Sequence, residues 1–332
     1  MANPTQSDLH VNVPLTNVSI AYIQKSDVYI ADKVFPRVPV PHQSNLYYRY
    51  AKKDWRRTDV QRRAPGTETV GIGWNVDTDS YFCHVYGVHK DIDDQVRANA
   101  DSVFKLDSDA TAFVTNQLLM KRDLDWAAAF FRKGVWDVDM ELADTDSNAT
   151  KVRWDRATSD PIKLIADLQV TGVLTTGHKY NTMVVGANVM NALKNHPEIL
   201  DRIKYTQKGI VTEDLIATLF DVKKIYTSYA TLSEGPDVND ARLGDELSEH
   251  KFVCDPNSVL LCNTVESPGL MTPTAGYTFT WNGYLAGNNH GIRMSRFRME
   301  HIRSDRIEGE MTYDMKVVCP DMGLFISKVV GD

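Results

Sequence analysis

The chain has 332 residues, of which 42% are hydrophobic and 24% charged, a composition that is ordinary for a folded protein of one large or two smaller domains. It excludes a disordered or collagen-like chain, and the lack of any run of about 18 apolar residues excludes a transmembrane helix. The first residues have neither a basic segment nor an apolar core, so we expect no secretory signal. The four cysteines (Cys83, Cys254, Cys262 and Cys319) form no CxxC pair, which predicts free thiols in a reducing compartment.

The formal net charge of −7 conceals one strongly basic segment. Seven basic residues between positions 49 and 63 stand against two aspartates, a balance of +5, and the remaining 30 basic and 42 acidic residues give −12. The seven are Arg49, Lys52, Lys53, Arg56, Arg57, Arg62 and Arg63. Downstream, Asp77 to Asp109 contains eight aspartates and only three basic residues. A short basic segment on an acidic body predicts contact with a polyanion or with another copy of the chain.

The N-terminal part of the chain reads as an arm followed by a long excursion. Five prolines punctuate residues 1–45 and keep much of this arm extended, although a short amphipathic piece fits Val18 to Ala31. Leu46 to His89 reads as two strands, with turn residues near the tip at Ala64 to Thr67. Neither strand has enough apolar residues for a core of its own. We therefore expect this excursion to pack on something outside itself.

The clearest element is a helix from about Asp107 to Lys133. Asp107 or Ser108 can cap its start, and Gly134 follows its cationic end. Its apolar residues lie on more than one side, which predicts a helix packed between other elements. The residues expected to form this structural spine are Phe113, Leu118, Leu124, Trp126 and Phe131.

After position 159 the pattern alternates between helices and strands. Ser159-Asp160-Pro161 is a strong helix start, residues 181–186 read as a buried strand, and Thr212 caps another helix that precedes a strand at 222–227. Residues 233–250 read as a loop, and strand-like segments return from position 251 onward. The whole pattern predicts an α+β protein.

A search for chemistry finds no acid, base and nucleophile in a familiar arrangement. No phosphate-binding glycine loop occurs, and His84 and His89 fall on opposite faces of the expected strand. Asp91, Asp93 and Asp94 could form a carboxylate pair, but they fit an acidic helix start better. The residues from Asp144 onward resemble the start of a calcium loop and lack its glycine and glutamate, which favours a solvated turn. We expect no catalytic residues, no cofactor and no metal.

The order of these parts resembles the major capsid proteins of tailed bacteriophages, which have the Hong Kong 97 fold. The resemblance covers nearly the whole chain. It is carried by packing and interface patterns, without a catalytic signature, in the stretches FPRVPVPHQSNLYYRY, RRAPGTETVGIGW, HKDIDDQVRANAD, NTMVVGANVMNALKNHPEILDRIKYTQKGIVTEDLIATLFDVKKIY and RIEGEMTYDMKVVCPDMGLFI.

The resemblance implies a division of the chain into named parts. These are an N-terminal arm (1–45), an extended β-hairpin loop (46–88), a peripheral domain (89–159) with a spine helix at 107–133, an α/β axial domain (160–285), and the peripheral return strands (286–332). Some members carry a helical scaffolding segment before the arm, and we expect none here. Some also crosslink a loop lysine to an asparagine, but Lys52 and Lys53 are candidates only by location, so the crosslink is not carried over.

The resemblance also implies a function. The expected protein is a non-enzymatic shell protein of the virion, made in the host bacterial cytoplasm, that forms hexamers and pentamers around double-stranded DNA contacted non-specifically. Its other expected partners are a portal and scaffolding or decoration proteins, and it has no membrane contact. The seven basic hairpin residues and Asp91, Asp93 and Asp94 are candidates for contacts between subunits. We expect Arg56, Arg57, Arg62 and Arg63 to lie over a neighbouring subunit, near acidic segments such as Asp91 to Asp94.

Two alternatives remain from the residues alone. The basic segment at 49–63, with its aromatic neighbours, could bind nucleic acid, although the acidic chain as a whole favours self-association. The lobe at 160–285 could belong to an α/β hydrolase or transferase, but it offers no identifiable site.

Overall fold

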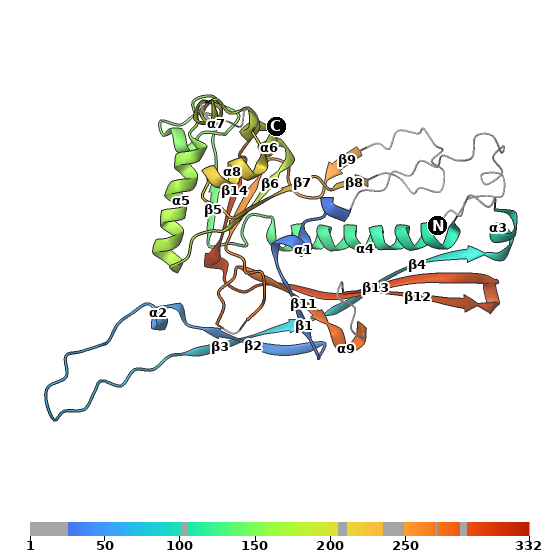
Figure 1. The fold of residues 1–332 in the computed structure, drawn as a ribbon, viewed down its shortest axis with the longest axis horizontal. Coiled ribbons are helices and arrows are strands. Elements are labelled where there is room, and N and C mark those ends of the chain that lie inside the picture. Colours follow the sequence, from blue (N-terminus) through green and yellow to red (C-terminus); the bar gives the residue numbers. More distant parts are fainter. Residues whose placement is uncertain are drawn as a thin grey trace.

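The computed structural model describes residues 26–100, 105–204, 211–234, 249–269, 271–285 and 291–331. It has three parts: an α/β lobe, a long sheet with a helix beside it, and a narrow loop that projects from the body (Figure 1). Most of the amphipathic piece expected at Val18 to Ala31 lies outside the described residues. No helix in the described ranges is long and apolar enough to cross a bilayer.

The long sheet is organised around one 14-residue strand, β13 (Ser304–Val317). Antiparallel β12 pairs along one side of β13 and antiparallel β4 along the other, while the last residues of β13 pair with β11. β1 extends the sheet in parallel with β11. The partner strands are β1 (Arg37–Val40), β4 (His84–Asp93), β11 (Gly276–Trp281) and β12 (Ile292–Met299).

The expected spine helix is confirmed as α4 (Leu106–Phe130), which ends three residues earlier than predicted. Its first half lies on β4 and β13, where Val114 and Leu118 occupy successive turns of one face and are buried. A Cβ added at Gly309 would come within 2.6 Å of the Val114 side chain. Only glycine therefore allows β13 and α4 to approach this closely.

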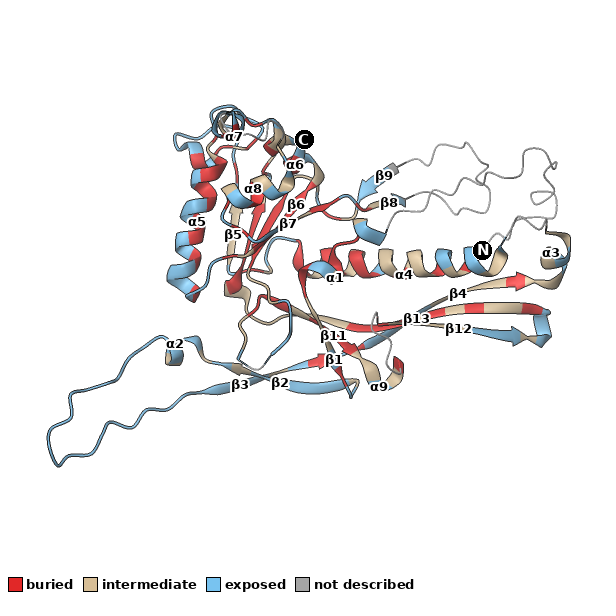
Figure 2. Cartoon of the chain, viewed as in Figure 1, coloured by how far each residue is buried: buried red, intermediate tan, exposed pale blue. Residues whose placement is uncertain are grey.

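The α/β lobe contains a second five-stranded sheet in the order β5-β14-β10-β6-β7. One face packs on the helices of the lobe, and the opposite face packs on the end of α4 (Figures 1 and 2). The strands are β5 (Val138–Glu141), β6 (Thr182–Gly186), β7 (Lys224–Ser228), β10 (Val259–Cys262) and β14 (Gly323–Ser327). The helices are α5 (Pro161–Thr176), α6 (Ala187–Asn195), α7 (Pro197–Ile203) and α8 (Glu213–Leu219).

Several local signals act as the sequence predicts. The Asp160 carboxylate accepts the Lys163 N–H at 2.8 Å and caps α5, which ends at Gly177 with a left-handed φ of 82°. Asp93 caps α3 (Asp94–Asn99) by accepting the Gln95 N–H at 2.7 Å. The short elements are η3 (Ser26–Val28), α1 (Ala31–Val34), η4 (Ala149–Lys151), α9 (Asn282–Leu285), η5 (Glu300–Ile302) and η6 (Pro320–Met322).

The sheets do not follow the expected domain boundaries. β5 and β14 were expected with the peripheral parts but lie in the lobe sheet, and β11, expected in the axial domain, lies in the long sheet. The reason for β14 is that it is apolar on both faces: Leu324 and Ile326 face the helices of the lobe, and Phe325 faces α4. In the expected loop at 233–250, β8 (Thr231–Glu234) and β9 (Glu249–Phe252) pair at the two ends. Residues 235–248 between them lie outside the description.

The second half of α4 is enclosed on several sides. Trp126 and Phe130 are fully buried, and Phe35 lies against both of them, with ring centroids 6.2 and 4.5 Å away. Leu118 and Phe131 are also buried, and Leu124 is partly buried. Phe113 does not belong to this spine, because it lies about 100° around the helix from Val114 and is 48% exposed.

We predict that Trp126→Ala lowers the free energy of unfolding by about 3–5 kcal/mol, because it leaves a large cavity between α1, α4 and the lobe sheet. Phe113→Ala on the solvent side of the same helix should cost about 1 kcal/mol or less. Chemical denaturation of the unassembled chain measures both values. Equal stability of the two variants would contradict the packing described here.

Candidate intersubunit interface

The projecting loop begins as a two-stranded antiparallel ribbon. β2 (Ser44–Tyr50) pairs with β3 (Val76–Phe82) in a register that places Tyr47 opposite Asp79. One face of this ribbon packs on the long sheet: the Tyr81 ring stacks on Phe279 with centroids 4.6 Å apart, and Tyr47 lies 5.4 Å from the same ring. The ribbon is therefore fixed to the body along its inner face.

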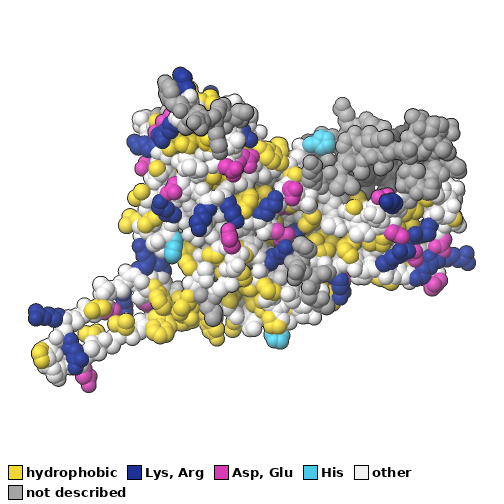
Figure 3. Space-filling model, viewed as in Figure 1, with side chains coloured by type: hydrophobic (Ala, Val, Ile, Leu, Met, Phe, Trp, Pro, Cys, Tyr) yellow, Lys and Arg dark blue, Asp and Glu magenta, His cyan; other side chains and the backbone are white. Residues whose placement is uncertain are grey.

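The outer face of the ribbon is apolar and uncovered. Because side chains alternate along a strand, the residues between those of the inner face point away from the body. The large residues of this outer face are Leu46 (60% exposed), Tyr48 (70%), Tyr50, Val76 and Phe82, and the smaller polar residues Ser44, Thr78 and Ser80 lie among them. Hydrophobic side chains gather where the loop leaves the body (Figure 3). A contiguous patch of this kind on a folded chain marks an interaction surface.

Beyond the ribbon the loop has little regular structure. The short helix α2 (Lys52–Trp55) places Trp55 near Tyr50 and Trp74, with ring centroids 6.1 and 6.4 Å away. The predicted tip turn is present at Ala64 to Thr67, where the Thr67 N–H donates to the Ala64 carbonyl. The segment between α2 and β3 is exposed along its length (Figure 2).

Two of the predicted basic contact residues instead bind their own chain. The Arg56 guanidinium donates to the carbonyls of Leu174, at 2.8 Å, and of Thr175, at the C-terminal end of α5. The Lys52 ammonium lies 2.6 Å from the Asp321 carboxylate. The last carbonyls of a helix lack intrahelical partners and carry partial negative charge, which explains the position of Arg56. These contacts tie the base of the loop to the α/β lobe.

The other basic residues of the segment have weaker ties or none. Arg49 lies 3.9 Å from Asp79, the Arg57 guanidinium lies 3.1 Å from Asp59, and Arg63 donates to the Thr67 carbonyl. Within the described ranges, Lys53 and Arg62 have no ion-pair partner. The cations left for an outside partner therefore lie mainly toward the loop tip.

The predicted acidic partners are occupied within the chain. Arg306 binds Asp91 through two hydrogen bonds of 2.7 and 2.8 Å, and Arg298 binds Asp94 in the same two-pronged way. Both contacts lower the pKa of the carboxyl group they bind. Asp93 caps α3. Each of these carboxylates thus has a partner within its own chain, and their contact with a neighbour's hairpin stays a prediction.

The same end of the long sheet holds a larger network of arginines and aspartates. Arg97 binds Asp107 at 2.7 Å and Asp305 at 3.1 Å, and Arg296 bridges the same two carboxylates. The network joins α3, the start of α4 and the strands β12 and β13. These elements are distant in sequence, so no local spacing signals the cluster.

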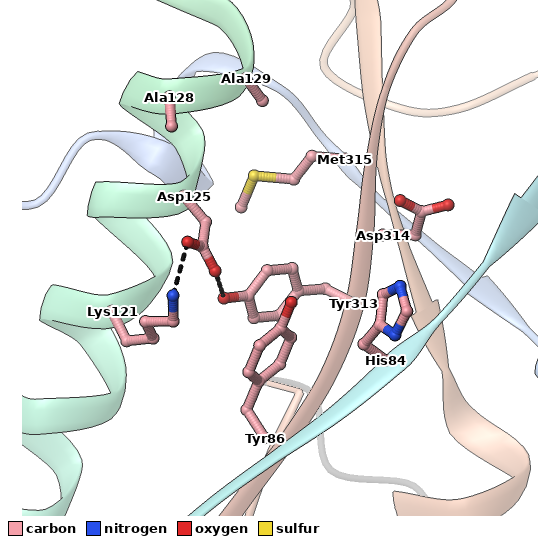
Figure 4. A pocket seen from close by; sticks show the side chains of 9 residues that line it. All are labelled: His84, Tyr86, Lys121, Asp125, Ala128, Ala129, Tyr313, Asp314 and Met315. Atoms are coloured by element: carbon pink, nitrogen blue, oxygen red, sulfur yellow. Dashed lines mark hydrogen bonds and ion pairs between the residues drawn. The ribbon is translucent and has the colours of Figure 1, made fainter.

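A shallow pocket that the sequence did not predict lies between α4 and strands β4 and β13 (Figure 4). Its volume is about 330 Å³. The Asp125 carboxylate accepts hydrogen bonds from the Tyr313 hydroxyl at 2.6 Å and the Lys121 ammonium at 2.7 Å. The Tyr86 ring stacks on Tyr313, with centroids 4.6 Å apart. Burial, and then Asp125, raise the pKa of Tyr313. One carboxylate oxygen therefore holds α4 to β13, while the other is bound by Lys121 of α4 itself.

A buried serine and histidine in the lobe lie close together. The Ser159 hydroxyl is 3.0 Å from His196 Nε2, while His196 Nδ1 accepts the Glu198 N–H at 3.3 Å. Burial lowers the pKa of His196, which favours the neutral ring. A neutral ring that accepts at Nδ1 carries its proton on Nε2 and donates to the serine. This arrangement is the reverse of a general base that activates a nucleophile.

Comparison with known sequences gives two capsid relatives, although no family model matches the chain. The chain is 25% identical over 232 residues to a major capsid protein of Burkholderia phage BcepMu, covering 68% of this chain and 71% of the relative. It is 24% identical over 332 residues to a major capsid protein of Pseudomonas phage JBD67, covering 97% of each.

Comparison with solved structures identifies the same fold. A phage-related protein from Bordetella bronchiseptica matches with a TM-score of 0.66 and 18% identity, over 93% of this chain and 94% of that one. The capsid of cyanophage P-SCSP1u matches with a TM-score of 0.58 and 13% identity, over 97% and 93%. The mature capsid of bacteriophage PhiM1 gives a TM-score of 0.58 with 12% identity, over 96% and 92%.

We predict that Arg56→Ala loosens the base of the loop, because it leaves the carbonyls at the end of α5 without this donor. Cleavage by chymotrypsin after Tyr50 or Trp55 should become several-fold faster, as expected for the loss of about 1 kcal/mol. Arg57→Ala is the matched control, because it removes the same charge from the adjacent residue, which pairs with Asp59 inside the loop. It should leave the cleavage rate nearly unchanged. An equal effect of both changes would show that general charge, and not the contact with α5, fixes the loop.

Proposed function

We propose that this chain assembles with copies of itself into the icosahedral shell of a tailed phage, as its major capsid protein. Its curated relatives are major capsid proteins of phages and its fold is that of phage capsid subunits, so the resemblance seen in the sequence is confirmed and a structural role in the virion is supported. The observation that carries the proposal within this structure is the uncovered apolar face of the β2–β3 ribbon.

The outer face of the β2–β3 ribbon is expected to bind a partner, because a single chain leaves its apolar side chains exposed to water. Its inner face is already packed on Phe279, so the outer face, with Leu46 and Tyr48, stays in water in a single chain. Burial of apolar surface stabilises association by about 25 cal/mol per Å² before the costs of ordering. In a closed shell the same contact repeats at every subunit. A second copy of the chain is the partner that such repetition requires.

The rest of the proposal concerns the complete particle. The subunits form hexamers and pentamers, enclose double-stranded DNA that they contact without sequence preference, and work with a portal and with scaffolding or decoration proteins. The chain is made in the cytoplasm of a bacterial host and performs no catalysis. The proposed division keeps the order of arm, loop, peripheral domain and axial domain along the chain. It assigns β5 and β14 to the lobe sheet and β11 to the long sheet.

One observation keeps nucleic-acid binding as a second candidate for the loop. Trp55 and Trp74 are 58% and 62% exposed beside the cations Lys53 and Arg57, a combination of stacking surfaces and positive charge that single-stranded nucleic acid uses. Reversing charges at the loop should impair assembly if the loop contacts another subunit, and should impair DNA binding if the loop contacts nucleic acid.

We predict that Tyr48→Glu prevents assembly, because it places a charge in the centre of the apolar ribbon face. The isolated chain should keep its melting temperature, since the side chain lies largely in solvent. Tyr48→Phe keeps the apolar surface and should still assemble. Electron microscopy and light scattering measure the particles. Normal shells from the glutamate variant would remove the ribbon face from the interface.

We also predict that reversing Arg62 and Arg63 to glutamate at the loop tip impairs assembly in the absence of any DNA. Each exposed ion pair contributes only about 0–1 kcal/mol, but the loss repeats at every subunit contact. DNA retention by the particles is measured beside assembly, across a series of salt concentrations. Intact empty particles with reduced and steeply salt-dependent DNA binding would instead assign the loop to nucleic acid.

A further inference from the structure

A buried carboxylate of α4 contributes to holding the segment before β1. Asp123, which is fully buried on α4, accepts the backbone N–H groups of Ile30 at 2.9 Å and of Ala31 at 2.8 Å through the same oxygen, Oδ1. These donors start α1, and Ile30 and Phe35 of the same segment are buried against the end of α4. The second oxygen, Oδ2, is also buried and has no hydrogen-bond partner among the residues that the structure describes.

We infer that Asp123 is a proton-sensitive latch, which holds residues 26–40 on α4 more tightly when its carboxyl group is protonated than when it is ionised. This inference concerns the attachment of one segment within the subunit and does not depend on the proposed shell function.

The geometry explains why the ionised form is costly. Beside Asp123 on α4, the buried Arg122 guanidinium binds Asp32 of α1, and Arg37 lies 3.4 Å from the same Asp32. The cation nearest in sequence is therefore paired with another carboxylate. Oδ2 faces the interior, where a charge without hydrogen bonds is strongly disfavoured. A protonated carboxyl keeps Oδ1 as the acceptor for both N–H groups and removes that charge.

The remaining titratable groups that interact with Asp123 do not reverse this preference. Tyr29, from the docked segment, donates its hydroxyl to Asn116 at 2.8 Å, and burial followed by the charge of Asp123 raises its pKa to about 12. Burial also raises the pKa of Cys254, to about 12, so its thiol is neutral. Burial raises the pKa of Asp123 to about 6, against the lowering effects of the two N–H groups and Arg122.

The direction of the pH dependence follows from this shift. In the docked state the carboxyl group binds a proton at about pH 6, whereas in an undocked, hydrated segment it does so near its ordinary value of 3.8. Docking therefore becomes more favourable as the pH falls from about 7 toward 4, and the gain levels off below the undocked pKa. Between pH 7.5 and pH 5 the docking constant should rise about tenfold.

Hydrogen exchange of the full chain, read by mass spectrometry, tests the latch directly. After correction for the intrinsic pH dependence of exchange, protection in residues 30–35 should be about tenfold higher at pH 5 than at pH 7.5. Peptides covering β6 and β10 in the lobe core report any change in global stability and should not follow the same course.

Asp123→Asn is the decisive variant, because it keeps the acceptor oxygen and mimics the protonated group. Its protection should match that of the unaltered chain at pH 5 and should not change with pH. Asp109→Asn removes the same charge from an exposed position of α4 and should leave the pH dependence intact. Protection of the unaltered chain that does not vary with pH, or an Asp123→Asn variant that varies as much as the unaltered chain, would overturn the latch.

Discussion

The structure depends on the burial of the C-terminal end of α4 between the lobe sheet and the α1 segment. The last turns of α4 insert Trp126 and Phe130 between the α1 segment and the lobe sheet, with Phe35 against both rings. The first turns of the same helix lie on β4 and β13. Helix α4 thus fixes the position of the long sheet relative to the lobe. The loop packs on β11 of the long sheet, so its direction depends on the same contacts.

Polar contacts also link the segments that the apolar contacts bring together. Asp125 links α4 to Tyr313 of β13, and Asp123, two residues earlier and about half a turn around the helix, links α4 to α1. Arg56 joins the loop to the end of α5. Each of these contacts connects segments more than 90 residues apart in sequence, and each uses a charged side chain to bind backbone or hydroxyl groups of another segment.

The sequence predicts local structure well, because local structure depends on signals close together in the chain. The start of α5 at Asp160 and Pro161, the approximate length of α4 and the tip turn at Ala64 to Thr67 are all predicted in this way. Contacts between distant segments are not. Neither the place of β14 in the lobe sheet nor the pairing of Asp91 with Arg306 has a local signature. Arg56 was assigned to a neighbour because its charge is visible in the sequence, whereas the free carbonyls at the end of α5 are not.

The outermost strand of the long sheet has a consequence for the chain before it finds its partners. Within the described part of the chain β12 is the last strand of the sheet and pairs with β13 alone, and an edge strand of this kind is where chains can add to one another in aggregates. Arg293, Arg296 and Arg298 lie on this strand, and each forms an ion pair within the same chain. The bulk of these side chains hinders the approach of a second strand to the same edge. The edge of β12 is therefore protected against non-specific pairing, while the apolar face of the β2–β3 ribbon stays free for specific contact.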